Sequence, residues 1–155
     1  LNLQMKIENK QLISNIFNSI KNIAIVGASL DMYRPSNEVM EYCKKYDYKI
    51  FPVNPKYSGK NILGVKCFDS LYELPEPIDI VNVFRKSEHC FEIAKSAVEI
   101  NAKILWMQIG VINNHAIEYA KINGLIVFQD TCIRSIHKKF LKNIDGGNNA
   151  LSSKI

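Results

Sequence analysis

The residues best suited to chemistry in this sequence lie between an apolar run and an amphipathic segment. Residues 23–26 are apolar and β-branched or small, and short side chains and a helix start follow them. The residues concerned are Gly27, Ala28, Ser29, Arg34, Pro35, Ser36 and Asn37. A glycine lets the backbone bend, small side chains leave room for an anion, and the N–H groups of a helix start point toward negative charge. This order predicts a phosphate-binding loop. Since no nucleophile and base stand together near it, nucleotide binding is favoured over catalysis.

Three more loops follow apolar runs that are typical of strands. They are Val53-Asn54-Pro55-Lys56, Phe84-Arg85-Lys86 and Gln108-Ile109-Gly110. Because ligands of open parallel sheets bind beyond the carboxyl ends of the strands, we expect all four loops to converge on one crevice. Arg34, Lys56 and Arg85 are its candidate cations. Arg34 and Lys56 are equally compatible with solvated loops, whereas the position of Arg85 directly after a strand favours a role in binding.

No catalytic or metal-binding constellation is expected in this crevice, which is predicted to hold neither a carboxylate pair nor a histidine. His89, His115 and His137 have no partner spacing and are expected at the surface. Trp106 is expected in the core. The cysteines contain no C-x-x-C pair, which excludes zinc spacing and predicts reduced, mostly buried thiols in a cytoplasmic protein. They are Cys43, Cys67, Cys90 and Cys132.

Two features of dinucleotide dehydrogenases are missing. The sequence lacks the G-x-G-x-x-G fingerprint, and Asn54-Pro55-Lys56 stands where an acidic residue would hold a ribose diol. A phosphorylated ribose, or a diphosphate nearby, suits a cation at this position better than the free ribose of NAD does.

Apolar patterning predicts the elements that position these loops. Short apolar runs at 22–28, 48–53, 78–84, 103–108 and 125–128 alternate with helical patterns, of which the one after 22–28 is capped by Ser36 or its neighbour. This alternation predicts an α/β, Rossmann-like, doubly wound sheet of five parallel strands with helices on both faces in a single domain, in the order 3-2-1-4-5. The predicted segments are a lead-in helix at 1–21, the domain at 22–133, and a basic helix with a mobile tail at 134–155, the tail starting at Asp145.

Composition narrows the choice of partners. The 155-residue chain is 47% hydrophobic and 23% charged with a net charge of +5, which is ordinary for a globular domain and modestly favourable to a polyanionic ligand. Its lysines are spread along the chain, which disfavours nucleic acid. No apolar run approaches the roughly 20 residues of a membrane span, so no membrane partner is expected.

The loops together resemble a known family. The chain is similar to the small CoA-binding domain proteins and to the nucleotide-binding domain of the succinyl-CoA synthetase α subunit. The resemblance covers about residues 20–133. It is carried by IAIVGAS at 23–29, RPSNEVM at 34–40, IFPVNPK at 50–56, ILGVKCF at 62–68, DIVNVFR at 79–85, KILWMQIGV at 103–111 and FQDTC at 128–132.

The resemblance implies a Rossmann-like domain that holds coenzyme A or an acyl-CoA. By it, residues 27–29 with Arg34, Ser36 and Asn37 would face the diphosphate, and residues 53–56 would lie along the 3′-phosphate of the adenosine. Phe84 and Arg85 would flank the adenine or the pantetheine arm, while Gln108 and Gly110 would line the exit of that arm. The chain departs from the family in its basic segment 134–142 and in Thr131, where a basic residue is common.

Three hypotheses follow. The first is a cytoplasmic CoA-binding protein without chemistry of its own, and it is the one we favour. The second is an NAD(P)-linked reductase domain, or an acyl-CoA enzyme subunit whose partner supplies the missing acid and base. The third is an interaction module that uses the basic segment 134–142 to bind another protein or a second copy of the chain.

Overall fold

A computed structural model describes the backbone of residues 3–152 and the side chains of residues 9–146. The chain forms two compact units. One comprises residues 21–132, and the other combines residues 1–20 with residues 133–155. The two terminal segments, separated by more than a hundred residues in the sequence, therefore belong to the same unit.

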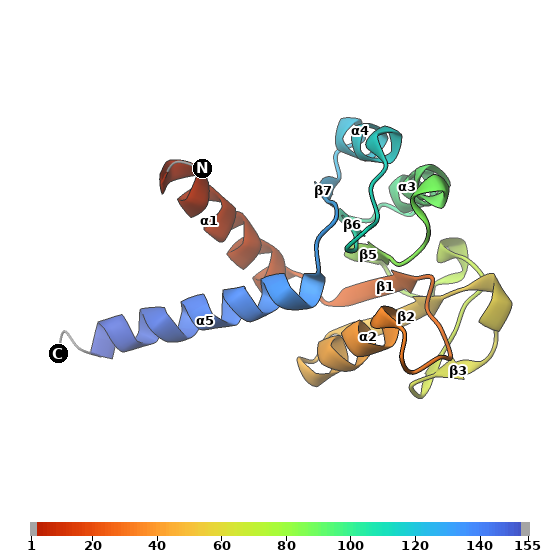
Figure 1. The fold of residues 1–155 in the computed structure, drawn as a ribbon, viewed down its shortest axis with the longest axis horizontal. Coiled ribbons are helices and arrows are strands. Elements are labelled where there is room, and N and C mark those ends of the chain that lie inside the picture. The colour runs from red at the N-terminus through yellow and green to blue at the C-terminus, as the bar shows by residue number, and fades with distance from the viewer. Residues whose placement is uncertain (1–2, 153–155) are drawn as a thin grey trace. The chain divides into compact units, whose positions relative to one another are not determined.

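Five parallel strands form the sheet of the unit 21–132 (Figure 1). They are β1 (Asn22–Val26), β2 (Lys49–Val53), β5 (Ile80–Val83), β6 (Ile104–Met107) and β7 (Ile126–Phe128). Every residue of β1, β5 and β6 is buried. Continuous apolar runs are what a parallel sheet covered on both faces requires. The predicted Rossmann-like α/β class is confirmed.

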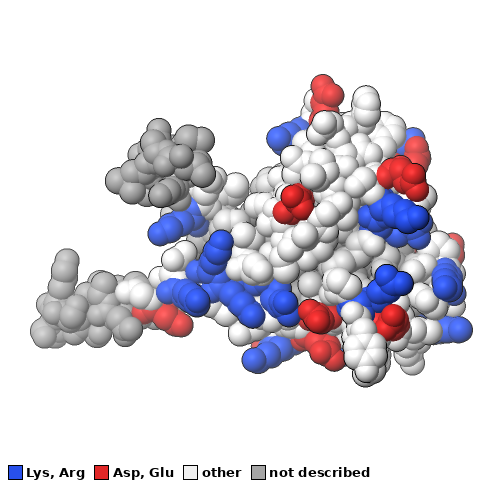
Figure 2. All heavy atoms as spheres, viewed as in Figure 1, with Lys and Arg blue, Asp and Glu red and all other residues white. Residues whose placement is uncertain are grey.

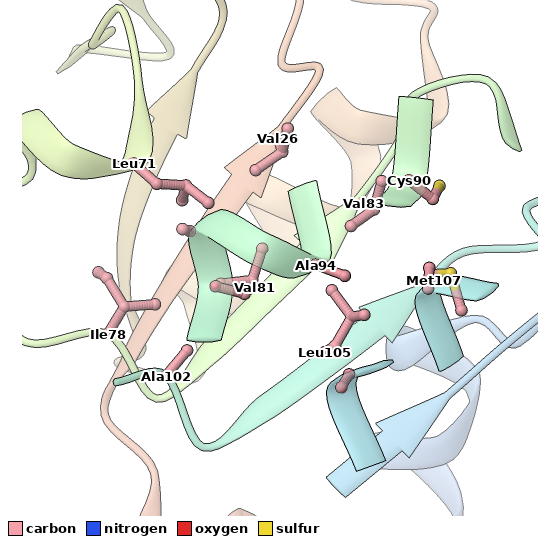
Figure 3. Packing of buried hydrophobic residues seen from close by; sticks show 14 of the residues in the cluster. Val26, Leu71, Ile78, Val81, Val83, Cys90, Ala94, Ala102, Leu105 and Met107 are labelled. Atoms are coloured by element: carbon pink, nitrogen blue, oxygen red, sulfur yellow. The ribbon is translucent and has the colours of Figure 1, made fainter. Parts of the chain in front are cut away.

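Helices cover both faces of this sheet. Helices α3 (Cys90–Glu99) and α4 (Asn114–Ile122) lie on one face, and α2 (Pro35–Lys45) lies on the other (Figure 1). Small residues of α3 and α4, such as Ala94 and Ala116, pack in one cluster with Val81, Val83 and Leu105 of the central strands (Figure 3). Because side chains alternate between the faces of a strand, the intervening residues of β5 point to the face that α2 covers.

The strand order β2-β1-β5-β6-β7 corrects the predicted order. In chain order the strands run 2-1-3-4-5, not 3-2-1-4-5, because the outer edge of β2 is occupied by Phe68. The Phe68 N–H donates to the Pro52 carbonyl at 3.0 Å, and the Phe68 carbonyl accepts from Asn54 N at 3.0 Å. The third strand, β5, instead pairs with β1, Ile23 opposite Ile80. Pro52 has no N–H to donate, which suits an edge strand.

The connection from β2 to β5 is irregular and contains only short elements, as its proline and glycine content predicts. It holds the turn η1 (Pro55–Tyr57), the hairpin of β3 (Asn61–Ile62) with β4 (Val65–Lys66), and the turn η2 (Leu71–Glu73). A third turn, η3 (Ser87–His89), precedes α3.

Asp79 fastens the amino ends of the strands. Its Oδ2 accepts from the backbone N–H groups of Lys21 at 2.8 Å and Asn22 at 2.9 Å, and its Oδ1 pairs with Lys103 Nζ at 2.9 Å. Partial burial alone would raise the pKa of this carboxyl, but the two N–H donors and Lys103 outweigh burial and lower it. The candidate site lies at the opposite, carboxyl edge of the sheet.

The second unit consists of α1 (Leu3–Ser19) and α5 (Ile133–Ser152). Its aromatic centre joins Phe17 of α1 to His137 and Phe140 of α5, with ring centroids 4.9 and 5.5 Å from that of Phe17. The prediction of a surface histidine at position 137 is wrong, since its side chain is only 3% exposed. Ile133, His137 and Phe140 recur at helical spacing and so share the apolar face of α5.

The predicted end of this helix is also corrected. Residues from Asp145 were expected to form a tail, whereas α5 continues to Ser152. Residues 153–155 of the predicted tail lie outside the described residues.

Within the described part of the chain, no helix combines the length and the apolar character needed to cross a membrane.

Burial of His137 predicts a pH dependence of stability. Desolvation lowers the pKa of His137 below its ordinary value, so the unfolded chain binds the proton more readily than the folded chain does. The free energy of unfolding therefore has its full value above the ordinary pKa of histidine, and it declines as the pH falls from about 7 toward 5. Thermal unfolding followed by circular dichroism measures this decline. His137→Gln should flatten it, and His115→Gln, which alters an exposed residue of α4, should not. An unchanged decline in the His137→Gln variant contradicts this assignment.

Candidate functional site

Gly27 brings the loops after β1, β2 and β5 together. Its N–H donates to the Val53 carbonyl at 2.9 Å, and its φ of +89° lies in the left-handed region that favours glycine. A Cβ at this position would lie 2.9 Å from the Phe84 carbonyl oxygen and 3.2 Å from Arg85 Cδ. The backbone turn after β1 therefore lies directly against the end of β5.

Asn54 ties the loop after β2 to the same turn. Its Nδ2 donates to the Ala28 carbonyl at 2.8 Å, and its Oδ1 accepts from Lys56 N at 3.0 Å. The second bond caps η1 and fixes the start of the Pro55–Lys56 turn. Both ends of the Asn54 amide are thus engaged in holding the two loops in place.

The loop from β1 to α2 is braced from within. Asn37 Nδ2 donates to the carbonyls of Ser29 at 2.7 Å and Asp31 at 2.6 Å, while Ser29 Oγ accepts from Asp31 N at 3.0 Å. Ser36 and Asn37 are buried beneath this loop, at 2% and 3% exposure. Asn37 accordingly acts as a brace that shapes the predicted phosphate loop.

The N-terminus of α2 has no side-chain cap. The helix begins at Pro35, and its N-cap is Arg34, which makes no side-chain hydrogen bond to the first turn. This corrects the expectation that Ser36 or its neighbour caps the helix. Pro35 has no N–H, and the Asn37 N–H donates to the Arg34 carbonyl at 3.0 Å. The N–H of Ser36 and the positive end of the helix dipole are therefore what this start offers to an anion.

The candidate cations differ in their surroundings. Arg34 Nε lies 3.6 Å from Asp31 Oδ2, and both side chains are largely exposed. Lys56 is exposed, with its Nζ 5.3 Å from the centre of the Tyr57 ring. Arg85 is half-buried and reaches the Gly27 turn. On the face drawn in Figure 2, basic and acidic side chains are interspersed over the sheet unit, unlike the basic field that nucleic acid requires.

A cavity of about 310 Å³ opens beside the Gly27 turn. Its volume is at the lower end of the range for small-molecule sites. Among the predicted site residues, it is lined by Gly27, Val53, Pro55 and Arg85. The remaining walls come from Val26, from residues 69–71, and from η3 and α3, including Ile93 and Ser96.

The expectation that the crevice holds neither a carboxylate pair nor a histidine is wrong for this cavity. Asp69, Glu88, His89 and Glu92 also line it, with His89 Nε2 3.7 Å from Glu88 Oε1. Sequence reasoning missed His89 because it expected this histidine at the surface without a partner. For Glu88, His89 and Glu92, their place in the first turns after β5 was the available signal, since these turns start at the carboxyl edge. The described residues contain no group of three or more His, Cys, Asp or Glu that could hold a metal ion.

The fourth predicted loop lies at the same edge but does not line the cavity. Gln108 N donates to the Val83 carbonyl at 3.2 Å, and the Gln108 side chain is buried. Gly110 N donates to Asp130 Oδ1 at 2.7 Å, which closes the loop onto the turn after β7. Trp106 is fully buried, as expected, and its Nε1 donates to the Thr131 carbonyl at 2.8 Å.

Apolar side chains at this edge were not anticipated from the sequence. Met32 and Tyr33, on the loop before α2, are 68% and 86% exposed, and Ile109, after β6, is 68% exposed. Single exposed apolar residues are common, but here they lie on two of the four predicted ligand loops. The edge thus combines backbone donors, cations and apolar surface.

Fold and edge together define a doubly wound α/β domain whose ligand crevice is expected at the switch point between β1 and β5. The sequence profile described as "CoA binding domain" matches residues 21–138. The chain belongs to this CoA-binding domain family.

Individual relatives agree with that assignment. A Bacillus subtilis (strain 168) protein described as uncharacterized protein YneT is 39% identical over 133 residues, covering 86% of this chain and 97% of that protein. An acetate–CoA ligase (ADP-forming) of Methanocaldococcus jannaschii is 37% identical over 60 residues, 39% of this chain and 8% of the ligase. The structure of cell-free ID.343 from Thermus thermophilus superposes with a TM-score of 0.82 at 30% identity, covering 85% of this chain and 98% of that one.

The close approach at Gly27 predicts a large effect of a single methyl group. Gly59→Ala is the matched control, since Gly59 has a φ of +80° but nothing within 4 Å of an added Cβ. The control should lose about 1–2 kcal/mol from backbone strain alone. Gly27→Ala adds a clash with the Phe84 carbonyl and should lose about 3 kcal/mol or more. Urea unfolding measures both losses. Equal losses in the two variants would show that the contact with Phe84 is unimportant.

Proposed function

We propose that this chain binds coenzyme A or an acyl-CoA at the carboxyl edge of its sheet and catalyses no reaction of its own. The observation that carries the proposal is the uncapped N-terminus of α2 behind the Gly27 turn, in a chain of the CoA-binding domain family. A diphosphate is the kind of group that such a helix start accepts. The four cysteines, all within the described residues, form no disulfide, and three of them are buried; this fits a reducing compartment, and we place the protein in the cytoplasm.

The loops divide the ligand among them. In this proposal, residues 27–29 and the start of α2 at Arg34–Asn37 face the diphosphate. Residues 53–56 lie along the adenosine, with Lys56 at its 3′-phosphate. Phe84 and Arg85 flank the adenine or the pantetheine arm, and Gln108 and Gly110 line the exit of that arm. The exposed Met32, Tyr33 and Ile109 offer apolar surface to the uncharged parts of the ligand.

The buried thiols of both helices, α2 and α3, support binding without covalent chemistry. Burial raises the pKa of Cys90 to about 11 and that of Cys43 to about 12, so both thiols are protonated at neutral pH. A protonated, buried thiol is a poor nucleophile. The Glu88–His89 pair is exposed, and His89 Nε2 lies 3.7 Å from Glu88 Oε1, which is longer than a hydrogen bond.

The Glu88–His89 pair nevertheless favours a second candidate, a subunit of an acyl-CoA enzyme that needs a partner. Its two side chains line the cavity beside the Gly27 turn, and the ligase relative is a much longer protein, of which the match spans 8%. Turnover of an acyl-CoA by this chain alone, lost in His89→Ala and retained in the exposed-site control His115→Ala, would replace the binding proposal with this one.

Calorimetric titration tests the ligand directly. The proposal predicts saturable binding of CoA, weaker binding of dephospho-CoA, and weaker binding still of NAD and NADP. Of these four ligands, only CoA carries the 3′-phosphate that a cation of the site would bind. A preference for NADP over CoA, or no binding of CoA, overturns the proposal.

Lys56 provides the corresponding test on the protein. Lys56→Ala should weaken CoA binding by about 1.5–3 kcal/mol, as expected for a hydrogen bond to a charged group, and should remove the preference for CoA over dephospho-CoA. Lys121→Ala is the control, because this exposed lysine lies in the last turn of α4, before β7 begins. A Lys56→Ala variant that still prefers CoA over dephospho-CoA would remove Lys56 from the 3′-phosphate site.

A further inference from the structure

We propose that Asn82 is a positioning residue, which fixes the side-chain amide of Gln108 so that its N–H groups face the ligand crevice. The ligand group they meet is an amide carbonyl of the pantetheine arm. This inference rests on the proposed function for the identity of the ligand, but the arrangement of the two side chains stands on the geometry alone.

Asn82 occupies a position where an apolar residue is expected. It lies in β5 between Val81 and Val83, which point into the core formed with α3 and α4 (Figure 3). Asn82 points to the opposite face of the sheet and is completely buried, at 0% exposure. Buried polar side chains in a central strand require hydrogen-bond partners.

The partners of Asn82 fix its orientation. Its Nδ2 donates to the Trp106 carbonyl at 3.1 Å and to Gln108 Oε1 at 3.3 Å. Because a backbone carbonyl can only accept, the first bond determines which end of the Asn82 amide is the nitrogen. The second N–H of the same nitrogen then determines that Gln108 presents its oxygen to Asn82. The backbone of β6 thus sets the orientation of both amides.

This arrangement leaves one acceptor without a partner. Asn82 Oδ1 is buried and accepts no hydrogen bond from the described residues. An unpaired buried acceptor lowers the stability of a fold, and a leucine of similar shape would avoid that loss. Residues that break a local rule in this way are expected where function, not stability, requires them. Stability alone therefore does not explain the asparagine.

The same bonds leave the nitrogen of Gln108 available. With Oε1 engaged by Asn82, the two N–H groups of Gln108 Nε2 are its remaining polar atoms. Gln108 is only 6% exposed, but Nε2 is not among the fully buried, unpaired atoms of the described side chains and makes no bond to them, so part of its surface is open. Gln108 follows β6 directly and lies beside the end of β5, at the carboxyl edge where the ligand crevice is expected. Two donors at this place suit an acceptor such as an amide carbonyl.

A thermodynamic cycle tests the coupling. The variants are Asn82→Leu, Gln108→Leu and the double variant, with CoA and adenosine 3′,5′-bisphosphate as ligands, because the second ligand lacks the pantetheine arm. We expect each single variant to weaken CoA binding roughly threefold to tenfold, as for one lost neutral hydrogen bond, and to leave binding of the bisphosphate unchanged. The double variant should bind CoA no more weakly than Gln108→Leu does. Additive losses, or an equal loss for the bisphosphate, overturn the proposal.

Stability and the amide itself provide readouts that do not depend on CoA. Asn82→Leu should unfold at a urea concentration no lower than the wild type. Asn82→Val serves the same purpose if Asn82→Leu does not fold. In nuclear magnetic resonance spectra, the side-chain N–H signals of Gln108 should shift in either Asn82 variant, and those of Gln129, an exposed residue after β7, should not. An unchanged Gln108 signal in the Asn82 variants overturns the positioning role. If the Gln108 signals shift in these variants but the wild type does not bind CoA, only the proposed ligand is refuted.

Discussion

The contact between the turn at Gly27 and the end of β5 is the constraint on which the rest of the site depends. The backbone at Gly27 lies so close to the Phe84 carbonyl that a side chain does not fit between them. This closeness exists because β5 is the direct neighbour of β1. The contact brings the start of α2, the side chain of Asn54 and Arg85 to one place. Each of these three can take part in binding only if the turn after β1 keeps its position.

The sequence predicted the elements well because apolar runs report burial. All five strands lie within largely apolar stretches, of which that of β5 is interrupted by Asn82, and the helices follow the amphipathic segments between them. The strand order was not predicted correctly, because burial says nothing about which neighbour a strand pairs with. One signal was present in Pro52, which cannot donate from the middle of a sheet and therefore marks β2 as an edge strand.

The sequence predicted which loops form the candidate site, but not which of their side chains face a ligand and which support the backbone. Residues that end strands must lie at the carboxyl edge, so the sequence located the turns at Gly27, Asn54 and Arg85. It could not show that Asn37 and Asn54 turn their amides inward as braces, since that depends on how the loop after β1 folds and presents its carbonyls. Nor could it bury His137, because the burial of this side chain follows from how α5 is rotated against α1.

Binding and support are divided between different residues at this edge. Backbone N–H groups and exposed cations are available to a ligand, while asparagine side chains hold the backbone that presents them. A site of this kind is rigid before the ligand arrives, and rigidity of that sort reduces the entropy lost on binding.

The most direct measurement is a titration of the ¹⁵N-labelled protein with CoA, followed by the backbone amide signals. If the helix start and the turn behind it hold the diphosphate, the amides of residues 27–29 and the first turn of α2 shift most, and those at the Asp79 end of the sheet stay in place. Shifts centred on α1 and α5, or spread evenly over the chain, would contradict a site at the carboxyl edge.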